Sequence, residues 1–340
     1  MSIEEKVPLA PYTTFHIGGP ARFFARVRSV EELRKSLDFA RDTKLATLVL
    51  GGGSNVLIDD AGFDGLVIKI ELRGITEEDS MIIAGAGEEW DALVSYAIQK
   101  KLWGIENLSG IPGSVGGAVA GSIGAYGQAV AQTIAWVEVF DRDSGVVEKK
   151  NKAECAFGYR ESIFGGPHAP LIILRAAFAL HTVPKPELSY KDLKLRFADA
   201  APSLAQIRET VLAIRKTKFP DLSEEGTAGS FFKNPIVRAD EAEKLKKIYP
   251  EMPLFAIPEA EGVKIPLAWL LDRVLDLKGM RIGGARLFEH QPLVIAVDTQ
   301  ASSHDVRMLA EHVKALVKEK FQIEIKEEVR MITRERLSTG

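Results

Sequence analysis

Glycine is concentrated in two short stretches of this sequence, and they constrain the fold more than any other feature. The first stretch follows the apolar run 45–50 and consists of Gly51, Gly52, Gly53, Ser54 and Asn55. Three residues without a Cβ atom allow a ligand to reach the backbone N–H groups, and Ser and Asn add short polar side chains. Such a loop suits a pyrophosphate, although a flexible turn explains it equally well when it is considered alone.

The second stretch is longer, and it favours ligand binding over a flexible turn. Residues 109–118 read SGIPGSVGGA and residues 121–127 read GSIGAYG. Glycines alternate with serines here and Pro112 stiffens the chain, which favours a fixed anion cradle. Two cradles predict a long ligand with a diphosphate. Neither is a Walker A loop or a G-x-G-x-x-G fingerprint, so nucleotide hydrolysis and a Rossmann site are disfavoured.

Length and charge exclude several other classes of protein. A chain of 340 residues has room for two or three domains. Its 44 Lys and Arg against 47 Asp and Glu give a net charge of −3, which argues against general nucleic-acid binding. The only cysteine, Cys155, and six scattered histidines offer no zinc spacing and no disulfide, so we expect no metal. The sequence shows neither a membrane span nor a signal peptide, and we expect a cytoplasmic protein.

Hydrophobic periodicity predicts a mixture of strands and helices without a sustained βαβ rhythm, which indicates an α+β fold. Strands are expected at 21–27, 45–50, 66–70, 293–297 and 323–332. Helices are expected from Ser29, over 90–98, from Ser203, and over 239–248, 267–275 and 303–320. The polar stretch 188–202 is expected to be an excursion or linker.

Three further segments carry side chains suited to chemistry. Arg160, in FGYRES, can bind a planar carboxylate, although a structural salt bridge is the commoner role for a lone arginine. Ser230, in GTAGSFFKNP, can donate a proton or cap a helix. Glu327 and Glu328 lie on a predicted strand whose alternation sends them to opposite faces, so at most one of them faces a shared site.

In order along the chain, these segments resemble the flavin-dependent UDP-N-acetylenolpyruvoylglucosamine reductases of bacterial peptidoglycan synthesis. Seven motifs carry the resemblance: TTFHIGG at 13–19, GGGSN, IPGSVGG, GAYG, FGYRES, AGSFFKNP and EVR at 328–330. The tyrosine segment 188–193 is similar to the loop of the first type of these enzymes, so we expect type I.

The resemblance implies an FAD-binding fold of the vanillyl-alcohol-oxidase (PCMH) type in two subdomains, with a smaller α+β substrate-binding domain. We expect the first subdomain at 1–70, joined by the returning strand 323–340, the second at 71–202 and the substrate-binding domain at 203–322. The residues implied to bind FAD are Gly51, Gly52, Gly53, Ser54, Asn55, Ile111, Pro112, Gly113, Ser114, Gly117, Gly124 and Tyr126.

Carried over by position, the resemblance implies Arg160, Ser230 and Glu328 as catalytic residues. NADPH would reduce FAD, and flavin N5 would then pass the hydride to the enolpyruvyl group of UDP-N-acetylglucosamine enolpyruvate. Arg160 and Glu328 would stabilise the enolate, and Ser230 would donate the proton that completes UDP-N-acetylmuramate. The residues implied to bind substrate are Tyr159, Tyr190, Lys218, Asn234 and Gln291.

Two alternatives remain at this point. One is a flavoprotein oxidase of a small alcohol or sugar lactone on the same scaffold, which would not need Ser230 and Glu328. The other is a non-catalytic nucleotide-sugar binding protein, which would keep the glycine loops without the catalytic trio. For the reductase we expect a monomer whose partners are small molecules, with no nucleic acid and no membrane.

Overall fold

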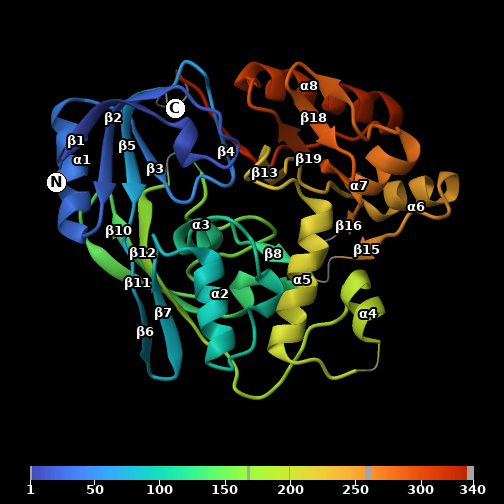
Figure 1. Cartoon of the computed structure of the whole chain (residues 1–340), viewed down its shortest axis with the longest axis horizontal. Coiled ribbons are helices and arrows are strands. Elements are labelled where there is room, and N and C mark those ends of the chain that lie inside the picture. Colours follow the sequence, from blue (N-terminus) through green and yellow to red (C-terminus); the bar gives the residue numbers. More distant parts are fainter. Residues whose placement is uncertain (1, 167–168, 199, 257–261, 335–340) are drawn as a thin grey trace.

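The computed structural model describes residues 2–166, 169–198, 200–256 and 262–334, and three larger sheets organise them (Figure 1). Each of these sheets takes its strands from one stretch of the chain. The first sheet lies within residues 3–70, the second within 75–178 and the third within 226–297.

The first sheet has the strand order β1-β2-β5-β3, with β1 antiparallel to β2 and the other neighbours parallel. Its strands are β1 (Ile3–Pro8), β2 (Pro20–Val27), β3 (Thr47–Leu50) and β5 (Phe63–Ile70). Helix α1 (Val30–Asp42) connects β2 to β3 and begins at Ser29, whose side chain accepts the Glu32 N–H at 3.1 Å. The predicted strand, helix and strand are thus confirmed, and β3 runs directly into the first glycine loop.

The second sheet is antiparallel throughout, in the order β11-β10-β12-β7-β6. Its strands are β6 (Ile75–Glu78), β7 (Met81–Gly85), β10 (Ile134–Asp141), β11 (Val147–Asn151) and β12 (Leu171–Phe178). Helices α2 (Trp90–Gln99) and α3 (Val115–Ala120) pack on it, and Trp90 is fully buried. Because residues of the first two sheets share one apolar core, the two sheets form a continuous body.

The third sheet, β13-β19-β18-β17, is antiparallel and has its own core. Its strands are β13 (Gly226–Ser230), β17 (Arg281–Ile282), β18 (Ala285–Phe288) and β19 (Gln291–Val297). Around it lie α6 (Ala239–Ile248), α7 (Leu267–Trp269), α8 (Ser303–Phe321) and a small sheet of β14 (Ile236–Val237), β16 (Val263–Lys264) and β15 (Phe255–Ala256). The helices predicted over 239–248 and 303–320 and the strand over 293–297 are confirmed.

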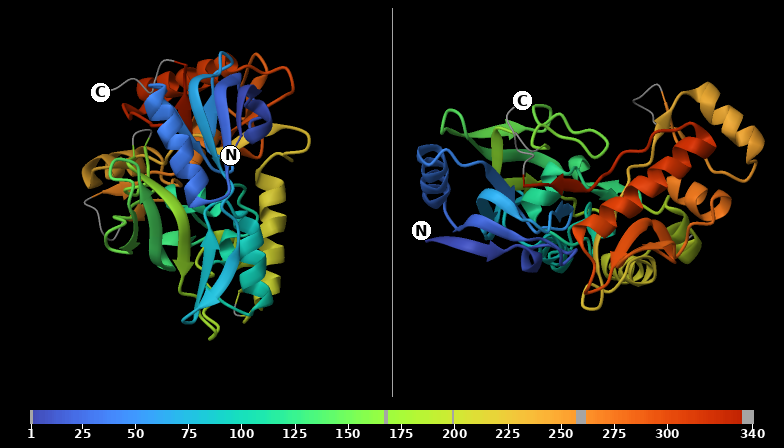
Figure 2. Two further views of the ribbon diagram at one scale, coloured as in Figure 1. Left: turned by 90° about the vertical axis from the view of Figure 1, so that its left-hand side faces the viewer. Right: turned by 90° about the horizontal axis from the view of Figure 1, so that it is seen from above.

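The end of the chain returns to its beginning. Strand β20 (Arg330–Ile332) pairs in parallel with β4 (Val56–Ile58), the strand after the first glycine loop. Figure 2 shows this segment leaving α8 and crossing back to the N-terminal part. The remaining elements are a short hairpin, β8 (Gly124–Ala125) with β9 (Gln128–Ala129), and the turns η1 (Ala10–Tyr12), η2 (Glu106–Leu108), η3 (Val130–Gln132) and η4 (Leu270–Val274).

Three sequence predictions need correction. The strand predicted over 323–332 exists only at Arg330–Ile332, because the residues before it make an isolated bridge between Glu327 and Phe232 instead of a ladder. The helix predicted over 267–275 is one turn of α7 followed by the π-helical turn η4. The stretch 188–202 contains the helix α4 (Lys191–Phe197) rather than linker alone; its residue 199, like residues 335–340 of the predicted returning segment, lies outside the described residues.

Helix α5 (Leu204–Lys218) begins at the predicted Ser203 cap, whose side chain accepts the Gln206 N–H at 3.3 Å. Its buried face packs with Trp103, Tyr126 and Leu193 of the second segment. We therefore propose that the substrate-binding unit begins after α5 and not at residue 203.

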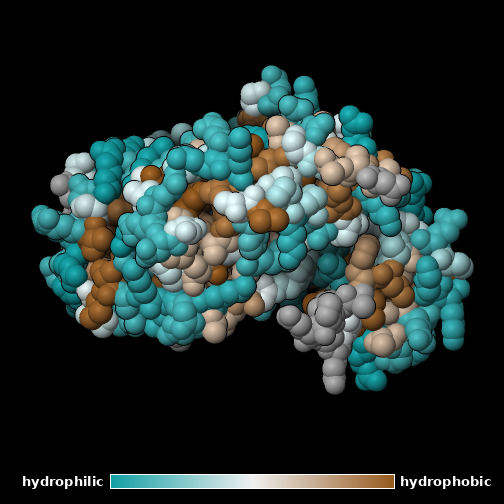
Figure 3. All heavy atoms as spheres, turned by 90° about the horizontal axis from the view of Figure 1, so that it is seen from below, coloured by the Kyte–Doolittle hydropathy of each residue, from teal (hydrophilic) through white to brown (hydrophobic). Residues whose placement is uncertain are grey.

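Hydrophobic side chains on the face shown in Figure 3 form separate patches among hydrophilic ones. The most exposed large apolar residues among those described are Val183, Leu195 and Ile248. Isolated exposed apolar residues of this kind are normal on folded proteins. Within the described ranges, no helix has the length and apolar character that a membrane crossing requires.

Candidate active site

The two glycine loops lie directly against each other. A Cβ atom added to Gly52 would stand 2.4 Å from the Cα of Gly113, and one added to Gly113 would stand 2.5 Å from the Ser54 Oγ. One added to Gly51 would lie 2.6 Å from the Ser114 Oγ. Part of the glycine requirement thus comes from the contact between the loops, which joins the first sheet to the second.

Backbone donors remain free where the loops meet. Among the described residues, the N–H groups of residues 52–55 and 113–114 donate to no acceptor, although these residues are buried or half-buried. Buried N–H groups are normally paired, so unpaired donors gathered in one place indicate a ligand. Ser114 caps α3 by accepting the Gly117 N–H at 3.3 Å. A group of backbone donors carried by glycines and by residues with short polar side chains fits the diphosphate of FAD.

The other predicted cofactor residues line the same body. Gly124 is in the β8–β9 hairpin, and Tyr126 follows it with a positive φ of 49° and a buried ring. Ile111 packs against the core beneath the second loop, and Pro112 is half-buried. The predicted set therefore comprises the two facing loops, the start of α3 and the β8–β9 hairpin.

Asn55 connects the first glycine loop to the end of the chain. Its side-chain Nδ2 donates to the Glu328 carbonyl at 3.1 Å, and its own carbonyl accepts the Arg330 N–H at 3.1 Å. These two bonds extend the β4–β20 pairing by one step. The carboxylate of Glu328 is therefore held beside the loop that is expected to bind the cofactor.

Arg160 meets Glu328 across this junction. The Arg160 Nε lies 2.8 Å from the Glu328 Oε1, while its NH2 donates to the Gly124 carbonyl at 2.7 Å. The Nε–H does not point at the carboxylate with hydrogen-bond geometry, so the contact is an ion pair. Arg160 has a positive φ of 59°, which is uncommon for a residue with a side chain and often marks functional sites. The sequence allowed two roles for Arg160, a structural salt bridge or the binding of a ligand carboxylate. The structure shows a salt bridge, and it joins two predicted catalytic residues.

Burial favours the protonated form of Glu328. Burial raises the pKa of this carboxyl above its usual range, while Arg160 and Lys233 act in the opposite direction. Its neighbour Glu327 turns to the other face and pairs with Lys314 at 2.9 Å. The prediction that the two glutamates point to opposite faces is confirmed.

Ser230 lies at the end of β13, one residue after Gly229 with its positive φ of 75°. It is a strand residue, so its alternative role as a helix cap is excluded. Its hydroxyl makes no hydrogen bond within the described chain and is half-exposed. The next residue, Phe231, accepts the Glu328 N–H on its carbonyl at 2.8 Å, so the backbones that carry Ser230 and Glu328 are adjacent.

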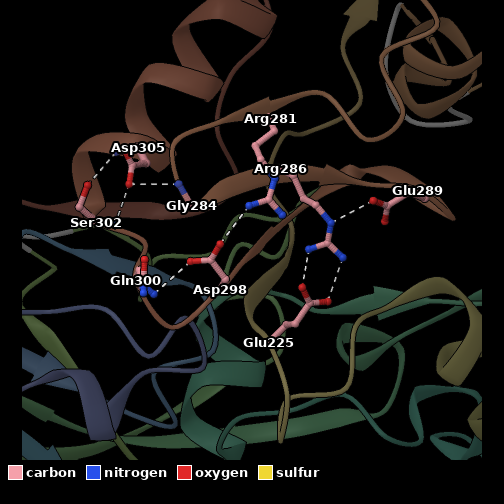
Figure 4. Close-up of polar contacts among 9 residues, drawn as sticks. All are labelled: Glu225, Arg281, Gly284, Arg286, Glu289, Asp298, Gln300, Ser302 and Asp305. Atoms are coloured by element: carbon pink, nitrogen blue, oxygen red, sulfur yellow. Dashed lines mark hydrogen bonds and ion pairs between the residues drawn. The ribbon is translucent and has the colours of Figure 1, made fainter.

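A charged network fixes the start of the strand that carries Ser230 (Figure 4). Arg286 on β18 holds the Glu225 carboxylate through two bonds of 2.5 and 2.9 Å and the Glu289 carboxylate through one of 3.0 Å. The Glu225 hydrogen bond, opposed by burial, raises the pKa of Arg286. Arg286 is only 13% exposed, so β13 is anchored at the residue that precedes it.

The predicted substrate residues form two pairs, with Gln291 apart from both. Asn234 donates to the Tyr159 hydroxyl at 3.5 Å and accepts the Leu267 N–H at 3.0 Å, beside Arg160. Lys218 donates to the Tyr190 hydroxyl at 3.2 Å and forms an ion pair with Asp192. Gln291 opens β19, where its Oε1 accepts the Leu293 N–H at 3.5 Å, and among the described residues it forms no hydrogen bond with the other predicted substrate residues.

The base of the Tyr190 segment is tied to the second glycine stretch. Asn107 is fully buried and donates to the carbonyls of Tyr126 and Glu187 at 2.7 and 2.8 Å. The Tyr126 and Tyr190 rings meet edge to face with centroids 5.0 Å apart. The tyrosine segment thus packs beside the predicted cofactor residues.

Sequence reasoning missed two cations near the site. Lys264 lies over the Tyr159 ring, with its Nζ 5.3 Å from the centroid. Arg215 donates from Nε to the Gly110 carbonyl at 2.9 Å, inside the second glycine stretch. Lys264 stands in a short KIP segment without a motif, so no local signal identified it. Arg215 was identifiable only as one of several basic residues at the end of a predicted helix.

A cavity of about 370 Å³ lies elsewhere, between α1 and the β10–β11 hairpin. Its lining includes none of the predicted site residues. In the ranges that the structure covers, no three His, Cys, Asp or Glu side chains gather as a metal would require.

Comparison with known proteins agrees with this geometry. A family model described as FAD binding domain matches residues 21–149, and one described as the C-terminal domain of UDP-N-acetylenolpyruvoylglucosamine reductase matches residues 221–332. The first two sheets therefore have the PCMH-type FAD-binding fold that the sequence predicts.

Similar proteins match over nearly their whole length. The UDP-N-acetylenolpyruvoylglucosamine reductase of Neisseria gonorrhoeae is 39% identical over 336 residues, covering 95% of both chains. That of Pseudomonas putida is 37% identical over 334 residues, covering 96% of this chain and 97% of the other. The crystal structure of the Thermus caldophilus enzyme superposes with a TM-score of 0.70 at 27% identity, covering 98% and 99%. By its identity, its coverage and its fold, the chain belongs to the UDP-N-acetylenolpyruvoylglucosamine reductase family.

Proposed function

We propose that this chain is an FAD-dependent oxidoreductase that reduces UDP-N-acetylglucosamine enolpyruvate to UDP-N-acetylmuramate with NADPH as co-substrate, a step of peptidoglycan synthesis. The observation that carries the proposal is the junction of Arg160 and Glu328, 2.8 Å apart, beside the strand that ends in Ser230 and at the edge of the glycine loops.

The glycine loops would hold the cofactor. The free N–H groups of residues 52–55 and 113–114 suit its diphosphate, and Gly51, Gly117, Gly124, Ile111, Pro112 and Tyr126 extend the proposed contact surface. Bound FAD supplies the hydride transfer that no amino-acid side chain can perform.

Arg160 would bind the enolpyruvyl carboxylate and stabilise the negative charge that forms next to it. Its guanidinium is already fixed by the Gly124 carbonyl and the Glu328 carboxylate, so little reorganisation is needed when charge develops. Glu328, whose pKa is raised by burial, can hold a proton beside that charge. A protonated carboxyl would donate a hydrogen bond where an ionised one would repel.

Ser230 would donate the proton that completes the product. Its hydroxyl has no hydrogen-bond partner within the described residues. It is therefore free to face the carbon that receives the proton, or to form a hydrogen bond with a water molecule. Glu328 is carried by the adjacent backbone, which makes the pair suited to proton delivery on one side of the substrate.

Lys218 and Tyr190 would bind the substrate diphosphate, and Asn234, Tyr159 and Gln291 its sugar and nucleotide groups. Lys218 is paired with Asp192 in this structure, so a diphosphate must replace that carboxylate. The tyrosine segment would close on the ligand, as we expect for the first type of the family. We further propose a monomeric cytoplasmic enzyme that acts on small molecules and on neither nucleic acid nor membrane.

The alternative oxidase of a small alcohol or sugar lactone is less well supported. The family model that matches residues 221–332 describes the reductase, and this part of the chain contains both Ser230 and Glu328. An oxidase would have no use for that junction.

An absorbance experiment tests the proposal. The purified protein should show flavin bands that NADPH bleaches under anaerobic conditions, and UDP-N-acetylglucosamine enolpyruvate should restore them. The product should be UDP-N-acetylmuramate by mass spectrometry. Absence of a flavin band, or reoxidation by oxygen and a sugar lactone substrate only, would contradict the reductase.

A further inference from the structure

Lys264 is a half-buried cation without a carboxylate partner. It lies on β16 between Ile236 and Phe255, which pair with it from the two neighbouring strands. Its Nζ is 5.3 Å from the centroid of the Tyr159 ring and 5.6 Å from that of Phe255. No acidic side chain of the described residues forms an ion pair with it, and burial followed by the charge of Arg160 lowers its pKa.

Two neighbouring cations are paired with carboxylates. Arg160 pairs with Glu328 at 2.8 Å, and Lys233 pairs with Glu161 at 3.4 Å. Lys264 has only aromatic rings, which attract a cation much less than a carboxylate does. A partly desolvated ammonium next to a guanidinium is unfavourable unless an anion joins them.

The position of Lys264 relates it to the reacting end of the substrate. The Arg160 Cζ lies 5.5 Å from the centroid of the same Tyr159 ring, so both cations lie close to one phenol ring. The residue after Lys264, Ile265, donates its N–H to the Pro235 carbonyl at 2.9 Å, which fixes β16 beside Asn234. Lys218, the cation proposed for the diphosphate, belongs instead to α5 and the Tyr190 segment.

We infer that Lys264 binds the carboxylate of the enolpyruvyl group together with Arg160 and so selects the enolpyruvyl nucleotide sugar over one that lacks this carboxylate. The inference rests on the proposed function. In it, Arg160 contacts the carboxylate on one side and Lys264 adds a second positive charge beside the same Tyr159 ring. The Phe255 ring, 5.6 Å from the Lys264 Nζ, covers part of this ammonium.

Two ligands and one substitution test it. The holoenzyme and Lys264→Met are titrated with UDP-N-acetylglucosamine enolpyruvate and with UDP-N-acetylglucosamine, which has the same nucleotide sugar and no carboxylate. We expect roughly tenfold to hundredfold weaker binding of the first ligand, the range for a lost charge-assisted bond, and a change of less than about twofold for the second. Lys264→Arg should restore part of the affinity for the first ligand alone.

Controls separate this inference from the proposed function. Lys278→Met removes an exposed ammonium paired with Asp272 and should leave both affinities unchanged. Wild-type protein that fails to reduce the enolpyruvyl substrate contradicts the proposed function itself. If wild type is active and Lys264→Met weakens both ligands equally, Lys264 serves the diphosphate and the inference is wrong; no change with either ligand overturns it as well.

Flavin content and the thermal unfolding midpoint are measured for every variant. If Lys264→Met loses flavin, Lys264→Gln takes its place in the same titrations. Loss of flavin in both variants would show a structural role and overturn the inference.

Discussion

The glycine loops and the Arg160–Glu328 junction are neighbours built on opposite principles. The loops at 51–55 and 109–118 come together because side chains are missing, and what they offer a ligand is backbone N–H groups. The junction consists of the side chains of residues 160, 230 and 328. Arg160 pairs with Glu328, and the Glu328 backbone bonds to Phe231, the residue after Ser230. An added methyl group should therefore harm the loops, whereas a removed functional group should harm the junction.

The largest expected effect is at the junction. Ser230→Ala should slow the reoxidation of reduced enzyme by the enolpyruvyl substrate by roughly 10²–10⁴-fold, because a positioned proton donor is lost. Reduction by NADPH should keep its rate. Stopped-flow absorbance of the flavin separates the two half-reactions. Ser223→Ala, at an exposed turn, is the control and should affect neither; equal slowing of both half-reactions in Ser230→Ala would assign the residue to binding or folding.

The support of the junction should be the next most sensitive. Arg286→Met breaks the two bonds to Glu225 ahead of β13 and should lower the free energy of unfolding by roughly 1.5–3 kcal/mol, since the guanidinium is largely buried. Arg281→Met is the matched control, because its bond to Asp298 is about half exposed and should contribute less than about 1 kcal/mol. Urea unfolding measures both. Equal losses would mean that Arg286 does not anchor the strand.

Within the loops, two glycines sharpen the comparison. Gly52→Ala places a methyl group 2.4 Å from backbone of the facing loop and should cost about 1–3 kcal/mol and reduce flavin content. Gly117→Ala meets only the Ser114 Oγ at 3.5 Å and lies in α3, so folding stability should change by less than about 0.5 kcal/mol. Thermal unfolding and flavin absorbance distinguish them. A tolerated Gly52→Ala would show that the loops do not pack rigidly.

The smallest effect concerns pH. Burial raises the pKa of folded Glu328 above its unfolded value, so its contribution to stability is fully present below the unfolded pKa of about 4.3 and is lost as pH rises through the folded pKa. The stability of wild type relative to Glu328→Gln should therefore fall as the pH rises above about 4. Glu327→Gln, on the opposite face, should show no such fall. A rise instead would mean that the attraction of Arg160 outweighs burial.

The sequence could predict what depends on local pattern. Caps at Ser29 and Ser203 and the apolar stripe of α8 locate helices because hydrogen bonding and periodicity act within a few residues. The prediction of a strand over 323–327 was wrong. Glu327 forms a single bridge to Phe232, a residue distant in sequence, and an alternating apolar pattern does not show whether a neighbouring strand is present to form a ladder. Lys264 was missed for the same reason, since its significance arises from Tyr159, on another segment. The junction itself was expected only through resemblance.

The β4–β20 pairing has a consequence for how the protein is made. The first glycine loop leaves the ribosome early, but Asn55 and β4 acquire their partners only when residues 328–332 have been synthesised. Strand β4 therefore cannot complete its pairing until the end of the chain has been made, and the Glu328 carboxylate arrives with the same segment. Truncation before Glu328 would remove both strand β20 and the carboxylate that pairs with Arg160.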